Sequence, residues 1–359
     1  MIISAAECFR YELPLTDPLD LGEHVLHVRQ GILLRLESAD GAVGWGEAAP
    51  LPGFSRETLG EASRHLQQQA EQLAGRELTD SVIDDALRRH VDADSPPSVQ
   101  FAVASAITEL WADRREMSVP AMLGGGAGTV PLNALIYGDD TDFANIAERY
   151  REAGFRAVKL KVGRRTVEED VARVQELAAR LGEDVALRLD ANRAWTFEQA
   201  IAFAERLEDV SVEYVEEPLE QPDRLSAFAE ATGLPVAIDE TTREIDPGAL
   251  GDVDGLAAVI LKPTMLGGIR HVRRWVIHTL NEGAAPVFSA AYESGVGTRM
   301  LVALASVLSD APAGLSTYTR LKADVLTPRL SMDGAEVSVD DGYAATVDQS
   351  QLHPLGDAE

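Results

Sequence analysis

The chain has 359 residues, and 45% of them are hydrophobic, which is enough for one large domain or two medium ones. Its formal net charge of −27 at pH 7 argues against binding to nucleic acid or to an anionic membrane surface. The apolar runs are short, and MIISAAECFRYELPL lacks the basic and apolar regions of a signal peptide. We therefore expect a cytoplasmic protein without membrane-spanning segments, and its single cysteine, Cys8, excludes an intrachain disulfide.

Residues 1–122 have the patterns of a small α+β domain. Strands are predicted by FRYELPL, HVLHVRQGILLRLES and GAVGWGEAAP, which are separated by Asp-Gly and Pro turns. Three segments with apolar residues at helical spacing predict helices: ETLGEASRHLQQQAEQLAG, SVIDDALRRHVDA and PSVQFAVASAITELWADRR. The glycine-rich LGGGAGT (123–129) follows no strand and lacks the GK[ST] of a phosphate-binding loop, so we interpret it as a linker.

From about residue 130 onward, short apolar runs alternate with helical stretches. The runs are VPLNALIYG, RAVKLKVG, VALRLDANRAW, VEYVEEP, LPVAIDE, AAVILKP and APVFSA. Polar or ionisable residues end most of them at intervals of 23 to 29 residues: Lys161, Asp190, Glu216, Asp239, Lys262 and Ser289. Each interval holds one strand and one helix, which is typical of a (β/α)-barrel with its active site at the carboxyl ends of the strands. A doubly wound open sheet shares the alternation, but it does not normally gather ionisable groups from so many consecutive strand ends.

Asp190, Glu216 and Asp239 end three successive predicted strands. Neighbouring strands are about 5 Å apart, so the three carboxylates can converge on one cation. A hard divalent ion relieves their mutual repulsion, and all-oxygen ligands indicate Mg²⁺, with Mn²⁺ as a substitute. The competing interpretation is that each carboxylate caps the helix that follows it.

Lysine is rare in this chain, with four residues against 28 arginines, and three of the four end apolar runs. Lys159 and Lys161 are two residues apart and therefore face the same side of a strand. Neighbouring ammonium groups disfavour double protonation, which predicts a lowered pKa for at least one of them and a base near neutral pH. Lys262 would reach the site from the opposite wall. For a single strand-end lysine, a solvated charge at the rim is the competing interpretation.

A divalent ion flanked by lysines indicates one type of reaction. The ion holds a substrate carboxylate, a lysine removes the proton from the adjacent carbon, and the metal stabilises the resulting enediolate. We therefore expect a small-molecule carboxylate as the substrate.

Further candidate substrate contacts flank the strand ends. Arg188 and Asn192 lie two residues before and after Asp190, on the same expected face. Arg188 would bind an anionic substrate group or pair with a metal-ligand carboxylate. The segment SAAYESGVG predicts a loop and a helix start that suit a second carboxylate, and helix capping by Ser294 is compatible with that use. Its candidate residues are Ser289, Glu293, Ser294 and Gly295.

Several motifs resemble those of the enolase superfamily, in the branch that includes muconate cycloisomerases. They are KLK (159–161), LRLDANRAW (187–195), VEEP (215–218), IDE (238–240) and LKPTMLGG (261–268). Within this branch, three further segments resemble the o-succinylbenzoate synthase family: WGEAAPLPGFSRETL (45–59), PSVQFAVASAITEL (97–110) and SAAYESGVG (289–297).

The resemblance implies a modified (β/α)7-8 TIM-type barrel over residues 130–320 with an N-terminal α+β capping domain over residues 1–122. Residues 321–359 would return to the capping domain, and residues 16–31, with PLPGF, would form a lid that excludes water. It also implies Mg²⁺ bound by Asp190, Glu216 and Asp239.

In the reaction of this family, Lys161 would take the α-proton of a cyclohexadiene carboxylate and return a proton to the departing hydroxyl. This is a syn dehydration in menaquinone biosynthesis. Lys159 would support Lys161, and Lys262 would stabilise the enediolate from the other face.

Two other functions remain open at this point. Relatives of the family racemise N-succinylamino acids, for which Lys161 and Lys262 would act as bases on opposite faces. A non-catalytic metal- or ligand-binding barrel is the other alternative, although opposed bases would have no purpose there. AGLSTYTRL (313–321) lacks the Asp-x-Asp pair of dipeptide epimerases, which argues against dipeptides, whereas cycloisomerisation uses the same scaffold. The role of Arg29 and the oligomeric state do not follow from the sequence.

Overall fold

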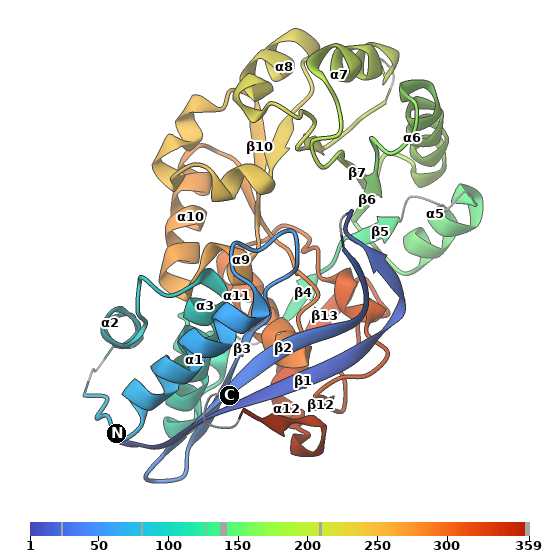
Figure 1. The fold of residues 1–359 in the computed structure, drawn as a ribbon. Coiled ribbons are helices and arrows are strands. Elements are labelled where there is room, and N and C mark those ends of the chain that lie inside the picture. The colour runs from blue at the N-terminus through green and yellow to red at the C-terminus, as the bar shows by residue number, and fades with distance from the viewer. Residues whose placement is uncertain (23, 80–81, 127, 137–141, 208–209, 356–359) are drawn as a thin grey trace.

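The computed structural model describes residues 1–22, 24–79, 82–126, 128–136, 142–207 and 210–355. Within these residues, an antiparallel sheet with its helices packs beside a curled parallel sheet that carries helices on its outer side (Figure 1). The expected enolase-like α/β architecture is confirmed. No helix in the described ranges is long and apolar enough to cross a membrane.

The antiparallel sheet of the capping domain has the strand order β15-β1-β2-β3. Its elements from the first part of the chain are β1 (Ile3–Asp20), β2 (Val25–Ser38), β3 (Val43–Ala48), α1 (Leu59–Leu73), α2 (Ile83–His90) and α3 (Pro97–Arg114). Gly44 and Gly46 permit close packing of β3 on α3, because a Cβ at either position would lie within 2.1 Å of a carbonyl oxygen of Ala106 or Ala102. Helix α3 is therefore held tightly between β3 and the barrel, and most of its residues are buried.

The segment expected to form a lid, residues 16–31, is mostly strand. β1 and β2 form a long antiparallel hairpin whose tip reaches over the barrel, as the dark blue arms in Figure 1 show. Residue 23, which belongs to the segment expected to form the lid, lies outside the described residues. The hairpin brings capping-domain side chains to the carboxyl ends of the barrel strands.

The barrel contains a sheet of seven parallel strands among the described residues, in the order β11-β10-β9-β8-β7-β6-β5. Their bounds are β5 (Ala134–Ile136), β6 (Ala157–Lys161), β7 (Ala186–Asp190), β8 (Tyr214–Glu216), β9 (Val236–Ile238), β10 (Leu256–Leu261) and β11 (Ala285–Phe288). Ala313 and Gly314 connect the two edge strands: the Asn133 amide donates to the Ala313 carbonyl (2.9 Å), and the Ala290 amide donates to the Gly314 carbonyl (3.0 Å). A two-residue segment therefore takes the place of a full eighth strand.

Helices alternate with these strands, as the sequence periodicity predicts. Capping boxes start two of them, with Thr166 and Glu169 at α6 and Thr196 and Gln199 at α7. The α-helices after α3 are α4 (Val119–Met122), α5 (Phe143–Glu152), α6 (Val167–Leu181), α7 (Phe197–Ala204), α8 (Leu225–Thr232), α9 (Pro263–Leu266), α10 (Ile269–Asn281), α11 (Gly295–Leu308) and α12 (Val339–Ala344). The 3₁₀ helices are η1 (Glu205–Leu207), η2 (Pro222–Arg224), η3 (Glu240–Arg243), η4 (Pro247–Asp252), η5 (Ser316–Arg320) and η6 (Gln349–Gln351).

The C-terminal segment returns to the earlier parts of the chain. Strand β13 (Glu336–Ser338) pairs with β4 (Thr129–Pro131), and β15 (His353–Pro354) pairs with β1. Strands β12 (Leu326–Thr327) and β14 (Thr346–Val347) pair with each other. The last described strand thus extends the capping sheet.

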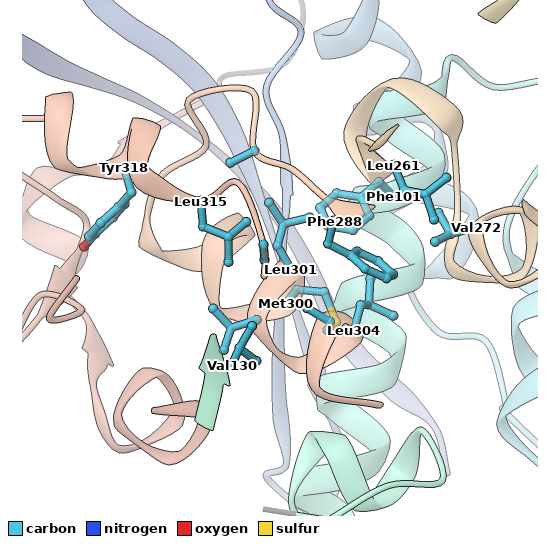
Figure 2. Packing of buried hydrophobic residues seen from close by; sticks show 14 of the residues in the cluster. Phe101, Val130, Leu261, Val272, Phe288, Met300, Leu301, Leu304, Leu315 and Tyr318 are labelled. Atoms are coloured by element: carbon cyan, nitrogen blue, oxygen red, sulfur yellow. The ribbon is translucent and has the colours of Figure 1, made fainter. Parts of the chain in front are cut away.

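One hydrophobic core runs through both parts of the molecule. Figure 2 shows α11 at its centre, with Met300, Leu301 and Leu304 packed among side chains from the capping helix α3 and from the barrel strands. The other residues labelled there are Phe101, Val130, Leu261, Val272, Phe288, Leu315 and Tyr318. Full burial of one such side chain is worth about 1.5–3 kcal/mol. We expect the capping domain and the barrel to unfold together, because neither buries this core alone.

Candidate active site

The barrel brings the six predicted lysines and carboxylates to one end of the sheet. Parallel pairing places Lys161 opposite Asp190 and Asp190 opposite Glu216. Asp239 and Lys262 directly follow β9 and β10. Lys159 and Lys161 therefore stand on one side of three carboxylates, and Lys262 stands on the other.

Each carboxylate contacts a lysine. Lys161 Nζ lies 2.5 Å from Asp190 Oδ2, and Lys159 Nζ lies 2.8 Å from Glu216 Oε2 and 3.1 Å from Asp190 Oδ2. Lys262 Nζ donates a hydrogen bond to Asp239 Oδ2. All three carboxylates are buried, so these contacts form in a region of low dielectric.

Lys159 is one of the two lysines for which a lowered pKa is predicted, but in this arrangement its pKa is raised instead. Burial alone would lower the pKa of Lys159, but attraction to Glu216 and Asp190 raises it well above its ordinary value. For Lys262, attraction to Asp239 likewise outweighs burial and raises the pKa. The reason is that Asp190 contacts both Lys159 and Lys161, so a negative charge offsets the repulsion that the sequence argument relied on.

The pKa values of the carboxylates Glu216 and Asp190 are shifted in opposite directions. Burial and repulsion from Asp190 raise the pKa of Glu216 to about 8. Burial also opposes ionisation of Asp190, yet Lys161 and Lys159 hold its pKa well below the ordinary value. Lysines therefore neutralise this acidic cluster unevenly, and one of its members keeps a proton readily.

The donor set of the cluster fits a hard divalent cation. The three buried carboxylates, with a pKa of Glu216 that burial and repulsion from Asp190 raise, supply oxygen ligands of the type that Mg²⁺ prefers. As oriented here, no three acidic, histidine or cysteine side chains in the described ranges are arranged to hold a metal ion. The carboxylates are instead hydrogen-bonded to Lys159, Lys161 and Lys262.

Asn192 connects the lysine to a second acid. Its Oδ1 accepts a hydrogen bond from Lys161 Nζ (2.6 Å), and its Nδ2 donates to Glu240 Oε1 (3.1 Å). Its backbone is left-handed (φ 43°), as is that of Arg193 (φ 60°) and Glu217 (φ 42°). Consecutive non-glycine residues in this conformation are costly unless their surroundings hold them.

Arg193 and Glu217 form the support that holds this loop. Arg193 Nε lies 2.9 Å from Glu217 Oε2, and Glu217 Oε1 accepts the backbone amides of Asp239 (2.8 Å) and Thr241 (2.6 Å). The backbone of Asp239 is thus held by Glu217, the residue that directly follows β8. Sequence reasoning missed Glu217, Glu240 and Arg193, although they belong to the VEEP, IDE and DANR motifs.

The expected role of Arg188 in substrate binding is wrong. Arg188 is fully buried and does not line the cavity described below. Its Nε donates to Glu213 Oε2 (2.6 Å), and its Nη1 donates to the Pro312 carbonyl (2.7 Å) and to Asn133 Oδ1 (3.2 Å). Arg188 thus ties β7 to the start of β8 and to the segment that closes the barrel, and it pairs with Glu213 instead of a candidate metal ligand.

The expected carboxylate site at the start of α11 is also wrong for Ser294, Gly295 and Glu293. Glu47 of the capping domain accepts the Ser294 amide (2.9 Å), and Asp324 accepts the Gly295 amide (2.8 Å). Glu293 accepts the Thr264 hydroxyl (2.6 Å) and the Ala291 amide (2.6 Å). Carboxylates of the protein itself already occupy the donors that were expected to bind substrate.

The alternative for Ser294, helix capping, is the one that the structure supports, since its hydroxyl accepts the Val296 amide (3.3 Å). Ser289 and Asn192 do line the cavity, together with Lys159, Lys161, Asp190 and Lys262. Glu216 and Asp239 do not line it.

A cavity of about 900 Å³ lies between the hairpin tip and these strand ends. Six of its lining residues are basic and two are acidic: Lys159, Lys161, Arg164, Arg165, Lys262 and Arg320 against Asp20 and Asp190. Apolar residues of the capping domain and the barrel form another wall: Leu19, Leu21, Leu51, Phe54, Met265, Ala291 and Tyr292. A basic cavity in a chain of net charge −27 suits an anionic ligand with an apolar body.

Two family models together match most of the chain. Residues 142–350 match the model of the family "Enolase C-terminal domain-like", and residues 3–110 match "MenC, N-terminal domain". A solved dipeptide epimerase from Cytophaga hutchinsonii, complexed with Mg and a dipeptide, has a TM-score of 0.84 over 99% of both chains at 22% identity, which supports the fold alone.

Curated relatives agree as well. The o-succinylbenzoate synthase of Edwardsiella ictaluri is 33% identical over 332 residues, which cover 89% of this chain and 92% of that protein. "Protein PHYLLO, chloroplastic" from Arabidopsis thaliana is 30% identical over 347 residues, which cover 85% of this chain but 20% of that much longer protein. The matched family model and the near full-length likeness to the first of these relatives show where the chain belongs. It is a member of the enolase superfamily and, within it, of the o-succinylbenzoate synthase family.

Proposed function

We propose that this chain is an o-succinylbenzoate synthase, a lyase of menaquinone biosynthesis. It would convert 2-succinyl-6-hydroxy-2,4-cyclohexadiene-1-carboxylate to o-succinylbenzoate and water. The observation that carries the proposal is the pair of opposed lysine groups across a buried carboxylate cluster, in a cavity with a basic side. The curated relatives support this choice of reaction.

Asp190, Glu216 and Asp239 would hold Mg²⁺, for which Mn²⁺ is a substitute with similar ligand preference. When bound, the cation would supply positive charge against the ring carboxylate of the substrate and against the negative charge that builds up there when the adjacent proton leaves.

Lys161 would remove the proton from C1 of the ring, which bears the carboxylate. The electrons released then form the C1–C6 double bond as the C6–O bond breaks, and the Lys161 ammonium returns its proton to the departing hydroxide as water. Because one side chain performs both transfers, proton and hydroxyl leave from the same face. Asn192 orients Lys161 for this role through the hydrogen bond between them (2.6 Å).

Lys262 would act as a cation on the opposite face. Its contact with Asp239 and its raised pKa support a protonated side chain that stabilises developing negative charge. Lys159, which bridges Glu216 and Asp190, would hold these two carboxylates in place.

The second carboxylate of the substrate, at the end of its succinyl group, also needs a cationic partner. Arg164, Arg165 and Arg320 line the same cavity as Lys161 and supply that charge. An N-succinylamino acid carries the same two carboxylates, so racemisation is the alternative that must be tested directly.

The deciding experiment measures two rates on the same Mg²⁺-loaded protein. One is dehydration of the cyclohexadiene precursor, and the other is exchange of the α-proton of N-succinylamino acids in D₂O. Fast dehydration with slow exchange supports the proposal, whereas fast exchange with negligible dehydration moves the function to racemisation. Binding of both the ligand and the metal, without turnover of either substrate, would indicate a non-catalytic barrel.

A further inference from the structure

Arg29 is a buried charge whose hydrogen-bond partners are all carbonyl oxygens. It is 2% exposed, and among the described residues no carboxylate lies within ion-pair distance. Its Nε donates to the Tyr292 carbonyl (3.0 Å), and its Nη1 donates to those of Pro50 (2.9 Å) and Gln30 (2.9 Å). Its Nη2 donates to Ala49 and Ala291. A guanidinium without a carboxylate is costly to bury, so these bonds offset a penalty that a neutral residue would not incur.

The five carbonyls belong to both parts of the molecule. Ala49 and Pro50 follow β3 in the capping domain, whereas Ala291 and Tyr292 follow β11 in the barrel. Leu51, Ala291 and Tyr292 line the cavity. A single side chain therefore joins two loops that face the ligand from different domains.

Tyr292 has a backbone that needs such support. Its φ is 63°, a conformation that a bulky residue rarely adopts. The hydrogen bond from Arg29 Nε fixes its carbonyl in this conformation, while its side chain packs against the buried cluster of Leu51, Met265 and Ala291. Removing the guanidinium frees the residue to relax to an ordinary backbone conformation.

The loops that Arg29 joins carry the apolar wall of the cavity. Leu51, Met265 and Ala291 form a buried cluster, against which Leu19, Leu21, Leu26, Phe54 and Tyr292 pack. The wall depends on the relative positions of the hairpin, the loop after β3 and the loop after β11. Lys161 and the carboxylates stand on other strand ends and do not contact Arg29.

We propose that Arg29 is a positioning residue that holds the apolar wall of the cavity in place by tying the Ala49–Pro50 loop to Tyr292. The wall packs against the carbon skeleton of the ligand, so Arg29 sets how tightly the ligand binds and leaves the lysine chemistry itself intact. The identity of that ligand rests on the proposed function.

The first test needs no ligand. Hydrogen exchange is compared between the wild type, Arg29→Met and Arg273→Met. Arg273 is the matched control, because its Nη1 donates to Asp84 of α2 (2.7 Å) and its Nη2 to the Leu123 carbonyl (2.7 Å), which also ties the capping region to the barrel but away from the cavity. Arg29→Met should speed exchange about tenfold in the amides around 49–54 and 290–293, with α10 unchanged. Equal exchange in both loops, or the same increase in Arg273→Met, would overturn the inference.

The second test separates this inference from the proposed function. Calorimetry measures binding of o-succinylbenzoate, and steady-state kinetics measure KM and kcat for its precursor. Arg29→Met should raise Kd and KM about tenfold while kcat changes by less than about threefold, and Arg29→Lys should recover part of the loss. If the wild type neither binds nor turns over these compounds, the proposed function fails. If the wild type does and Arg29→Met matches it, the inference about Arg29 fails.

A double-mutant cycle tests the path through Tyr292. In a Tyr292→Gly background, glycine tolerates the positive φ, so the added Arg29→Met should raise Kd less than it does in the wild type. Equal effects in both backgrounds would show that Arg29 does not act through Tyr292.

Discussion

Glu109 of α3 and Arg299 of α11 form a buried, two-point ion pair that joins the capping domain to the barrel. Arg299 Nε donates to Glu109 Oε1 (2.8 Å), and Arg299 Nη2 donates to Glu109 Oε2 (2.5 Å). Glu109 Oε2 also accepts the Trp45 amide of β3 (3.0 Å). The pair thus holds three elements together beside the shared core.

Removal of one partner of this pair should destabilise the whole molecule. Arg299→Met leaves the Glu109 carboxylate buried without a compensating charge, which costs about 3–5 kcal/mol. Urea unfolding should show this loss in a single transition, because the core is continuous between the two parts. The double variant Glu109→Leu, Arg299→Met should recover a large part of the loss, and a double variant no more stable than the single one would contradict this account.

Glu47 should make stability depend on pH. It is buried, and burial, opposed by hydrogen bonds from Ser294 and Tyr11, raises its pKa above the ordinary value of 4.5. The folded protein then binds this proton more tightly than the unfolded chain does. Its stabilising effect is fully present below pH 4.5 and is lost as pH rises through the raised pKa.

The test compares Glu47→Gln with the wild type across this range. The difference in unfolding free energy, wild type minus variant, should decrease as pH rises above 4.5. An increase would mean that the hydrogen bonds to the carboxylate outweigh its burial. Asp40→Asn is the control, because Asp40 is exposed and its pKa is lowered, mainly by a hydrogen bond from Ser38.

Cys8 should react slowly in the folded protein. Burial raises the pKa of its thiol to about 12, and only the thiolate attacks alkylating reagents. At pH 8 the thiolate fraction should be about a thousandfold smaller than in the unfolded chain. Iodoacetamide labelling with and without urea measures the ratio, and similar rates in both conditions would contradict a raised pKa of this partly buried thiol.

Magnesium should stabilise the fold through the carboxylate cluster. A cation that binds the folded state alone adds about 2.7 kcal/mol at a concentration of a hundred times its Kd. Tm should therefore rise with Mg²⁺ in the wild type and return after chelation, and Asp239→Asn should abolish most of the rise. Asp20→Asn is the control, since Asp20 lines the cavity but lies on the hairpin. An equal rise of Tm with Mg²⁺ in Asp239→Asn would mean that the metal binds at another site.

The barrel and its six strand-end residues could be predicted from the sequence because both depend on local periodicity. Alternation along a strand places Lys159 and Lys161 on one side, and repeated βα intervals place Asp190 and Glu216 on neighbouring strands. These relations involve one strand or two adjacent ones. They do not depend on contacts with other parts of the chain.

The roles of Arg188 and of the start of α11 could not be predicted, because both depend on residues far away in the sequence. Alternation correctly places Arg188 inside the barrel, but it does not tell which end its guanidinium reaches, and Glu213 attracts it away from the cavity. The amides of α11 are taken by Glu47 and Asp324, which lie 247 and 29 residues from their partners. Burial in the folded chain decides these pairings.

Substitution of Lys262 by arginine should distinguish dehydration from racemisation most clearly. In the proposed dehydration it acts as a cation, so Lys262→Arg, which keeps the charge, should retain measurable activity. As a base in racemisation it must lose a proton, which arginine does not do at neutral pH. Lys161→Ala should instead reduce dehydration by about 10²–10⁴-fold, since it removes the group that transfers both protons.

The measurement is dehydration and α-proton exchange on each variant, with Lys322→Ala as the control because Lys322 is exposed and lies outside the cavity. Lys262→Arg should lose exchange from the enantiomer whose proton faces residue 262 and keep part of its dehydration activity. Equal loss of both activities in Lys262→Arg would mean that the shape of the lysine, and not its charge alone, is needed in dehydration. Full dehydration activity in Lys161→Ala would exclude Lys161 as the base and leave Lys159 as the one remaining lysine on that side of the cluster.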